Sequence, residues 1–309
     1  MQKFIKSFNR NKELLLLAIP GALWFLIFSY LPMFGVVIAF KNFRVSSKGF
    51  IHSLFTSKWV GFKNFEFLFK TNDAWIITRN TVLYNAVFIV LGIVIPVCLA
   101  IAINELLNKR MAKIYQSAMF LPYFLSWVVV SYCLFAFLSG DKGYINNLLH
   151  MMGKEGVSWY SESKYWPYIL IFMSQWKGVG YGTVVYLASV TGIDKTYYEA
   201  AMIDGATKWQ QIRYITLPLL KPVIIILFIL SVGKIFNADF GLFYQLPKNS
   251  GALYPVTNVI DTYVYRGLTS MGEIGMSAAA GLYQSVVGFI LIMVSNHIVK
   301  KIDSENALF

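Results

Sequence analysis

The chain has 309 residues, of which 57% are apolar and only 14% are charged. Ordinary soluble domains contain about 45–50% apolar and about 25% charged residues, so this composition argues against a soluble globular protein. The net charge of +12 comes from basic residues scattered at the ends of apolar segments and in loops, with no basic helix. This scatter indicates a membrane protein rather than a nucleic-acid-binding one.

Six apolar segments reach the length of about 20 residues that a helix needs to cross a bilayer. Four of them carry no Asp, Glu, Lys or Arg, and the other two are each interrupted once, by Lys177 and by Lys234. We therefore predict an all-α integral membrane protein with six transmembrane helices, which places both termini on the same side. The six segments are residues 14–40, 80–104, 114–140, 165–193, 222–238 and 274–299.

Basic residues indicate the orientation of these helices. With cytoplasmic termini, the inner segments hold 13 Lys and Arg residues in 63 positions, and the outer segments hold 12 in 100. The inner side is the denser one, as the positive-inside rule expects. The first outer loop, residues 41–79, is an exception, because it holds seven of the outer basic residues. We predict cytoplasmic termini.

Enzyme and metal motifs are missing from the sequence. Cys98 and Cys133 both fall inside predicted spans, and His52, His150 and His297 are isolated from one another. No His-Glu-x-x-His, Gly-x-Ser-x-Gly or phosphate-loop pattern occurs. The sequence thus predicts no catalytic residue, no metal site and no cofactor bound by this chain, and it disfavours a membrane-embedded hydrolase.

The most informative segment is a polar island, residues 194–221, between the fourth and fifth apolar segments. It contains two pairs with the Ser/Thr-x-x-Glu/Gln form of a capping box, which marks the start of a helix. Gly205 lies between the pairs and is well suited to turn the chain at a helix end. We predict two short helices that meet at Gly205, the second ending at Leu217-Pro218. The two pairs are Thr196 with Glu199 and Thr207 with Gln210.

Small residues cluster in the same island. Ala200, Ala201, Gly205 and Ala206 leave a face with little side-chain bulk, which another backbone could approach closely. Such a face suits the docking of a partner, and it equally suits packing against helices of the same chain.

These residues also form a recognisable motif. Glu199-Ala200-Ala201, followed after three residues by Gly205 and after nine more by Ile215-x-Leu217-Pro218, resembles the EAA signature of bacterial ABC importer permeases. The flanks resemble the maltose-permease-like carbohydrate branch and its LplB-like polysaccharide-permease subgroup, over about residues 75–300. Where family members usually carry Ile-Pro, this chain has Ile193-Asp194.

The resemblance implies the type I ABC importer permease fold in a bacterial plasma membrane. Residues 1–74 would then hold the N-terminal tail, the first helix and the first outer loop. Residues 75–300 would form the transmembrane domain, with coupling helices at 194–218, and residues 301–309 a cytoplasmic tail. The chain would form half of an alternating-access pathway for oligosaccharides.

The resemblance also implies the partners. They are a second permease subunit of different sequence, two ATPase subunits that carry ATP and Mg, an extracytoplasmic solute-binding lipoprotein and an oligosaccharide substrate, with no nucleic acid. The EAA residues would dock in a cleft of the ATPase. The predicted ATPase-coupling residues are Glu199, Ala200, Ala201, Asp204, Gly205, Ile215, Leu217 and Pro218.

Charged residues inside spans are costly and usually face water or a protein interior. Lys177 lies near the middle of its segment, where it either lines a solute cavity or pairs with an acid. Lys234 and Asp239 lie nearer a segment end, from which they more readily reach the outer interface. Neighbouring aromatic and amide side chains could contact a sugar. The predicted solute-path residues are Gln175, Trp176, Lys177, Tyr181, Phe236 and Asn237.

Two rival functions stay open at this point. The EAA signature is shared across importers, so the solute could be an amino acid or phosphate instead of a sugar. An ion-coupled secondary transporter or channel would show internal repeats, and no convincing repeat relates the two halves of the sequence.

Overall fold

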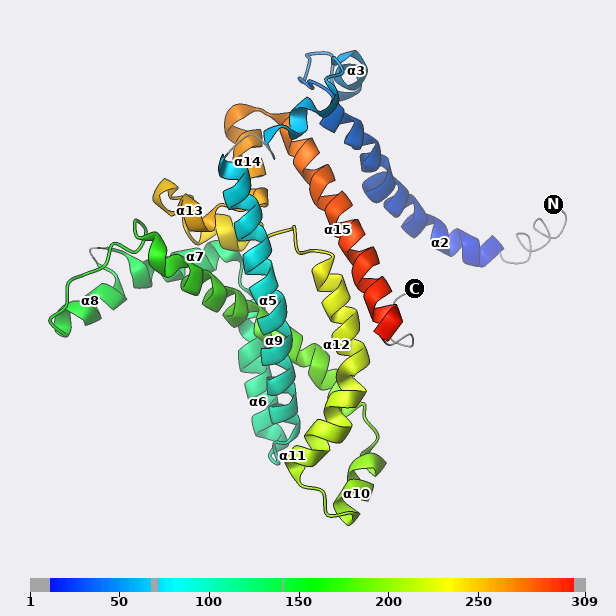
Figure 1. Cartoon of the computed structure of the whole chain (residues 1–309), viewed down its shortest axis with the longest axis vertical. Helices are drawn as coiled ribbons and strands as arrows, with labels where there is room; N and C mark the ends of the chain where they lie inside the picture. The colour runs from blue at the N-terminus through cyan, green and yellow to red at the C-terminus, as the bar shows by residue number, and fades with distance from the viewer. Residues whose placement is uncertain (1–11, 68–71, 141, 303–309) are drawn as a thin grey trace. The chain divides into compact units, whose positions relative to one another are not determined.

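The computed structural model describes residues 12–67, 72–140 and 142–302 (Figure 1). This described chain is helical throughout, and its β-type pairing is limited to an isolated bridge between Lys41 and Trp59. The predicted all-α class is therefore confirmed.

The described chain forms two compact units. The first contains the residues before the gap at 68–71 and Val264–Tyr283, and the second contains the remainder. The helices before that gap are α2 (Lys12–Phe25), η1 (Leu26–Tyr30), η2 (Leu31–Phe40), α3 (Phe50–Thr56) and η3 (Gly61–Phe65). Those after it are α5 (Asn72–Asn104), α6 (Lys109–Phe120), η4 (Leu121–Phe124), α7 (Trp127–Leu138), α8 (Tyr144–Met151), η5 (Ser163–Tyr165), α9 (Trp166–Thr191), α10 (Lys195–Ile203), α11 (Lys208–Gln211), η6 (Ile212–Thr216), α12 (Leu217–Val232), η7 (Gly241–Gln245), η8 (Gly251–Leu253), α13 (Tyr254–Thr257), α14 (Ile260–Met271) and α15 (Ile274–Ile302).

In the first unit, α2, η1 and η2 follow one another without a gap and form one long apolar run. The run loses its α-helical pattern just before Pro32, where the N–H of Leu31 reaches back five residues to the carbonyl of Leu26. Proline has no N–H and its ring crowds the preceding turn, so a widened turn accommodates it. After this run, Asn64 holds the chain by donating from Nδ2 to the carbonyls of Ala39 and Lys41, both at 2.9 Å.

In the second unit, α9 packs along α5 and crosses α6 at very short range. A Cβ atom at Gly180 would lie 1.9 Å from the carbonyl oxygen of Met119, and one at Gly182 would lie 2.9 Å from Cγ of Pro96. Small residues therefore let these helices approach backbone to backbone, as is common between helices in membranes. Buried side chains such as Trp166, which is fully buried, fill a core at the N-terminal end of α9.

The third predicted segment, 114–140, does not form one straight helix. α6 with η4 and α7 form a pair bent by 99°. Pro122 stands in the first turn of η4 and has no N–H to continue the hydrogen bonding of α6. The hydroxyl of Ser126 accepts the N–H of Val129 at 3.3 Å, which begins α7 afresh. The apolar pattern predicts one span here, and the structure has a bent pair of helices instead, because a proline and a local cap interrupt the helix.

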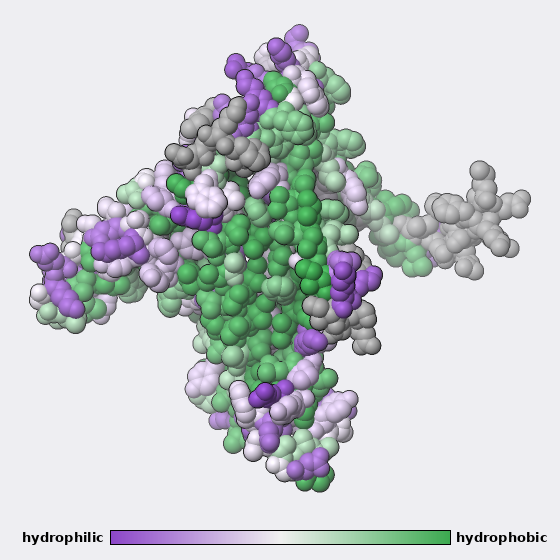
Figure 2. Space-filling view, in the orientation of Figure 1, coloured by the Kyte–Doolittle hydropathy of each residue, from purple (hydrophilic) through white to green (hydrophobic). Residues whose placement is uncertain are grey.

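Four helices within the described residues are long and apolar enough to cross a membrane, or five if the bent pair counts as one. The predicted number of six is not confirmed. The segment predicted at 165–193 forms α9, a continuous helix of 26 residues that is absent from that set. The segment predicted at 222–238 ends its helix early, at Val232. Figure 2 shows the apolar surface over α5 and α12, and a mixed, more polar surface around α10 and α11.

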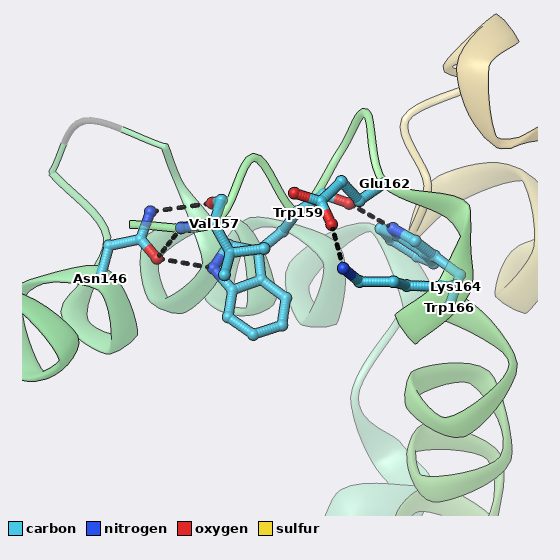
Figure 3. Close-up of polar contacts among 6 residues, drawn as sticks. All are labelled: Asn146, Val157, Trp159, Glu162, Lys164 and Trp166. Atoms are coloured by element: carbon cyan, nitrogen blue, oxygen red, sulfur yellow. Dashed lines mark hydrogen bonds and ion pairs between the residues drawn. The ribbon is translucent and has the colours of Figure 1, made fainter. Parts of the chain in front are cut away.

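The loop between α7 and α9 is held together by one buried amide (Figure 3). Asn146 on α8 is 1% exposed, and its Nδ2 donates to the carbonyls of Gly140 at 2.8 Å and Val157 at 2.9 Å. Its Oδ1 accepts the N–H of Val157 at 3.1 Å and Nε1 of Trp159 at 2.9 Å. The indole of Trp166 then donates to the carbonyl of Trp159 at 2.7 Å. The amide thus ties both ends of the loop to α8.

Replacing Asn146 with alanine should loosen this loop. The change leaves buried backbone and indole groups without partners, which costs roughly 2–4 kcal/mol. We expect faster hydrogen exchange and proteolysis across residues 142–165 in the reconstituted protein. Asn147→Ala is the matched control, because Asn147 is the neighbouring exposed asparagine. Equal protection in both variants would contradict the role assigned to Asn146.

Candidate functional site

The polar island folds as two short helices joined by a tight turn, at one end of the second unit (Figure 1). Gly205 adopts a φ of +76°, which favours glycine. Its N–H donates to the carbonyl of Met202 at 3.1 Å, and the N–H of Ala206 donates to that of Ala201 at 2.8 Å. This pair of bonds is a Schellman end for α10. The predicted Gly205 turn is confirmed.

The two helices begin differently. At α11, the predicted capping box is present, since Thr207 N–H donates to Oε1 of Gln210 at 2.7 Å and Gln210 N–H donates back to Oγ1 of Thr207 at 3.4 Å. At α10, the predicted box of Thr196 with Glu199 is wrong. Asp194 caps this helix by accepting the N–H of Thr196 at 3.0 Å. The same hydrogen bond lowers the pKa of Asp194 below its ordinary value, which favours the ionised cap at neutral pH.

The second short helix does not end at Pro218, contrary to the sequence prediction. α11 continues through η6 directly into α12. In η6 the turn widens, so that the N–H of Leu217 reaches back to the carbonyl of Ile212. A wide turn makes room for a proline in a helix that carries on. α11 and the candidate membrane helix α12 therefore form one continuous helical run.

The small-residue face of the island is open. Glu199, Ala200 and Gly205 are exposed, Ala201 and Ala206 are half-buried, and α10 has no buried residue. Within the described residues, this face is therefore not covered by helices of the same chain, which was one of its two interpretations. Large apolar residues are exposed around it, namely Tyr197, Met202, Ile203, Trp209 and Tyr214.

The other predicted coupling residues lie at the ends of these elements. Asp204 is the exposed C-cap residue of α10. Ile215 is half-buried in η6, and Leu217 and Pro218 begin α12 with exposed side chains. They connect the exposed loop to the membrane helix.

Two side-chain contacts brace the loop against the helices above it. Nζ of Lys208 lies 3.0 Å from Oε2 of Glu105, in the turn that follows α5. The hydroxyls of Tyr198 and Thr216 lie 2.9 Å apart. Because the Lys208–Glu105 pair is largely exposed, it stabilises by less than about 1 kcal/mol. A cavity of about 540 Å³ opens between these braces.

The Thr207 cap can be tested directly. Thr207→Ala should destabilise the start of α11 by about 1 kcal/mol, which corresponds to roughly fivefold faster amide exchange at residues 208–211. Thr196→Ala is the matched control. The 3.0 Å capping hydrogen bond of α10 comes from the backbone N–H of Thr196, which alanine retains, so we expect a smaller change there than at α11. Equal effects at the two helices would refute these cap assignments.

A second group of residues gathers where α9 meets the break between α6 and α7. Nζ of Lys177 donates to the carbonyl of Tyr123 at 2.8 Å and lies 5.4 Å and 5.3 Å from the ring centres of Tyr123 and Trp127. The rings of Tyr123 and Tyr181 stack at 4.9 Å and 15°. Lys177 forms no ion pair with any acid in the described ranges. The alternative that Lys177 pairs with an acid is therefore not supported within the described residues.

The segment after α12 is unwound and held by amide side chains. Nδ2 of Asn85 donates to the carbonyls of Ile235 at 2.8 Å and Asn237 at 3.1 Å. Nε2 of Gln284 donates to the carbonyl of Phe236 at 2.6 Å. Phe236 and Asn237 therefore accept these hydrogen bonds through their backbone carbonyls. Asn237 is exposed.

Asp239 links this segment to the first group. Its Oδ2 accepts the indole N–H of Trp127 at 2.8 Å, and its Oδ1 accepts the N–H of Leu242 at 3.2 Å. Lys234 lies exposed beyond the end of α12. The bond to Trp127 brings α7, α9 and the unwound segment to one place.

The structure brings together only part of the predicted solute path. Lys177 and Tyr181 are four residues apart and share one face of α9. Trp176 is 37% exposed but lies further round the helix. Gln175 lies on the far side from Lys177, and its Oε1 is buried without a hydrogen-bond partner within the described structure.

Three residues of this group escape the sequence prediction. Tyr123, Trp127 and Asn85 bear no charge, and each lies inside an apolar segment with nothing in its spacing to mark it. Pro122 followed by Ser126 is the one local signal for a break there. If Pro122 ends one helix and Ser126 caps the next, Tyr123 and Trp127 lie on either side of the break.

Comparison with known proteins identifies the family. Residues 92–304 match the family described as the binding-protein-dependent transport system inner membrane component. The chain is 36% identical to protein LplB of Bacillus subtilis (strain 168), over 98% of this chain and 93% of that protein. It is 34% identical to the permease protein YteP of the same organism, over 96% of this chain and 90% of YteP.

A solved structure agrees with these matches. The chain superposes with a TM-score of 0.87 on a chain of a bacterial ABC transporter involved in the import of the acidic polysaccharide alginate, at 32% identity, covering 97% of this chain and 99% of that one. The chain belongs to the family of inner membrane permease components of binding-protein-dependent ABC importers. It is a multi-pass bacterial membrane protein and a transport subunit rather than an enzyme.

Proposed function

We propose that this chain is the permease subunit of an ATP-driven importer for oligosaccharides and forms half of its pathway. The observation that carries the proposal is the open, capped α10–α11 loop, which continues without a break into the membrane helix α12. YteP is described as part of a polygalacturonan/rhamnogalacturonan transport system, and the superposed structure belongs to an alginate importer. These relatives support a saccharide as the solute.

The exposed loop is the proposed docking site for a cytoplasmic ATPase, which would hold the ATP and Mg. The small side chains around Gly205 would admit a closely packed cleft, and the exposed aromatic residues beside them would be buried by it. Movement of the ATPase would then pass along α11 and η6 into α12 and favour one of two states of the pathway. Alternating access in this form needs no flexible joint between the docking site and the membrane.

Six spans with cytoplasmic termini complete the proposed arrangement. α9 serves as one span, since its 26 residues reach about 39 Å at 1.5 Å per residue. The bent pair of α6 with η4 and α7 occupies another. The transmembrane domain would cover residues 75–300, and this orientation places α10 and α11 in the cytoplasm.

Two further partners belong to the proposal. One is a second permease subunit of different sequence that supplies the other half of the pathway, and the other is an extracytoplasmic solute-binding lipoprotein. A second structure of the alginate transporter, which superposes with a TM-score of 0.85, is in complex with a periplasmic protein that has bound an alginate pentasaccharide. That complex supports a binding protein as the source of the solute here.

The docking proposal is tested at Gly205. Gly205→Asp places a charged side chain on the docking face, where nothing lies within 4 Å of the new Cβ but the φ of +76° strains any side chain. We expect the variant to reach the membrane, to lose association with the ATPase and to lose ATP-driven uptake. Gly153→Asp is the matched control, because Gly153 has a φ of +73° and equally open surroundings in another loop, and it should keep ATPase association. Normal uptake with normal association in Gly205→Asp would refute the docking site.

The solute class needs its own experiment. The complete transporter, reconstituted with both permeases, the ATPase and the binding protein, should accumulate labelled oligosaccharides only when ATP is supplied. Amino acids and phosphate should not compete with them. Accumulation of either of those solutes instead would keep the importer but overturn the saccharide proposal. Uptake driven by an ion gradient without ATP would overturn both.

A further inference from the structure

The residues at the break between α6 and α7 form an aromatic cluster with one lysine, which we call the platform and define as Phe120, Tyr123, Tyr181, Trp127 and Lys177. The rings of Phe120 and Tyr123 stack at 5.7 Å and 9°, and those of Tyr123 and Tyr181 at 4.9 Å and 15°. The tyrosines are 43% and 50% exposed. The exposed parts of the tyrosine rings offer the apolar C–H face of a sugar ring a place to stack.

The ammonium group of Lys177 beside these rings keeps unused binding capacity. It has three N–H donors, and one of them goes to the carbonyl of Tyr123 at 2.8 Å. The faces of Tyr123 and Trp127 add attraction from their ring electrons at 5.4 Å and 5.3 Å. Neither a carbonyl nor a ring carries a full negative charge. The lysine therefore presents a net positive charge at the platform.

The acid connected to the platform does not cancel this charge. Asp239 accepts two N–H groups, from the Trp127 indole at 2.8 Å and from Leu242 at 3.2 Å. Its carboxylate is thus engaged by its own donors, and it lies outside ion-pair distance of Lys177 within the described structure. An ammonium without a counter-ion is costly in a low-dielectric setting. A solute that brings a carboxylate would offset that cost.

Resting on the saccharide function proposed above, we infer that the platform selects acidic oligosaccharides, with Lys177 binding the carboxylate of a uronate residue while the tyrosines stack on its ring. A neutral sugar would gain the stacking alone. The solute carboxylate and the Tyr123 carbonyl would then share the donors of one ammonium group.

The alternative is that Lys177 only closes the break by binding the Tyr123 carbonyl, and substitutions separate the two roles. Lys177→Gln keeps an N–H donor for that carbonyl but removes the charge, whereas Lys177→Arg keeps both. Lys234→Gln is the control, because it removes an exposed lysine that lies outside the platform.

The experiment compares two solutes of equal length, trigalacturonate and its fully methyl-esterified form, in the reconstituted transporter. For each solute, the uptake rate of each variant is divided by the uptake rate of the wild type. This ratio removes any preference of the binding protein for one solute. We expect Lys177→Gln to lower uptake of trigalacturonate at least tenfold and uptake of the ester less than twofold. Lys177→Arg should keep most of the acidic uptake, and Lys234→Gln should change neither.

Equal losses for the two solutes in Lys177→Gln would assign Lys177 a purely structural role and overturn the inference. Unchanged uptake of trigalacturonate in that variant would also overturn it. A wild-type transporter that imports the ester but not the acid would sink the inference while leaving saccharide import intact. Import of neutral oligosaccharides but of neither trimer would overturn the inference alone, and import of no oligosaccharide would overturn the saccharide function as well.

Discussion

Inside a bilayer, a backbone N–H or C=O that its own helix leaves unpaired must find a partner within the protein, because lipid offers none. The second unit depends on this constraint wherever a membrane helix breaks. At the α6–α7 break, Ser126 caps the new helix and Lys177 takes the carbonyl of Tyr123. After α12, Asn85 and Gln284 take three freed carbonyls. Each break is thus closed by a polar side chain from another helix.

This repair joins the two functional regions through a single element. α12 carries the unwound segment at one end, and at the other it continues through η6 into α11, the helix of the proposed docking site. A displacement of α11 therefore reaches the unwound segment along a helix rather than through a loop. The amides that hold the segment come from Asn85 on α5 and Gln284 on α15. Such a displacement would therefore also strain the hydrogen bonds to both of those helices. Packed helices tend to switch between discrete arrangements rather than deform gradually.

The sequence predicts the parts of this arrangement that depend on local chemistry. The Gly205 turn and the Thr207 cap follow from the needs of a helix end, and both are found. At α10 two cap residues, Asp194 and Thr196, stand two positions apart, and spacing alone does not decide between them. The breaks escape prediction for another reason. Hydropathy counts apolar side chains, whereas a break depends on whether a distant partner such as Asn85 can satisfy the backbone.

The same chemistry explains why the breaks and the platform coincide. A polar solute needs donors, acceptors and accessible aromatic faces at membrane depth, where intact helices offer mainly apolar side chains. A break exposes such groups, and the residues that repair it add more. Lys177 serves both purposes in this account, because one N–H closes the break and the rest of the ammonium group is left for a ligand. An amide such as Asn85 repairs a break equally well, so a lysine at this position adds charge that the repair itself does not require.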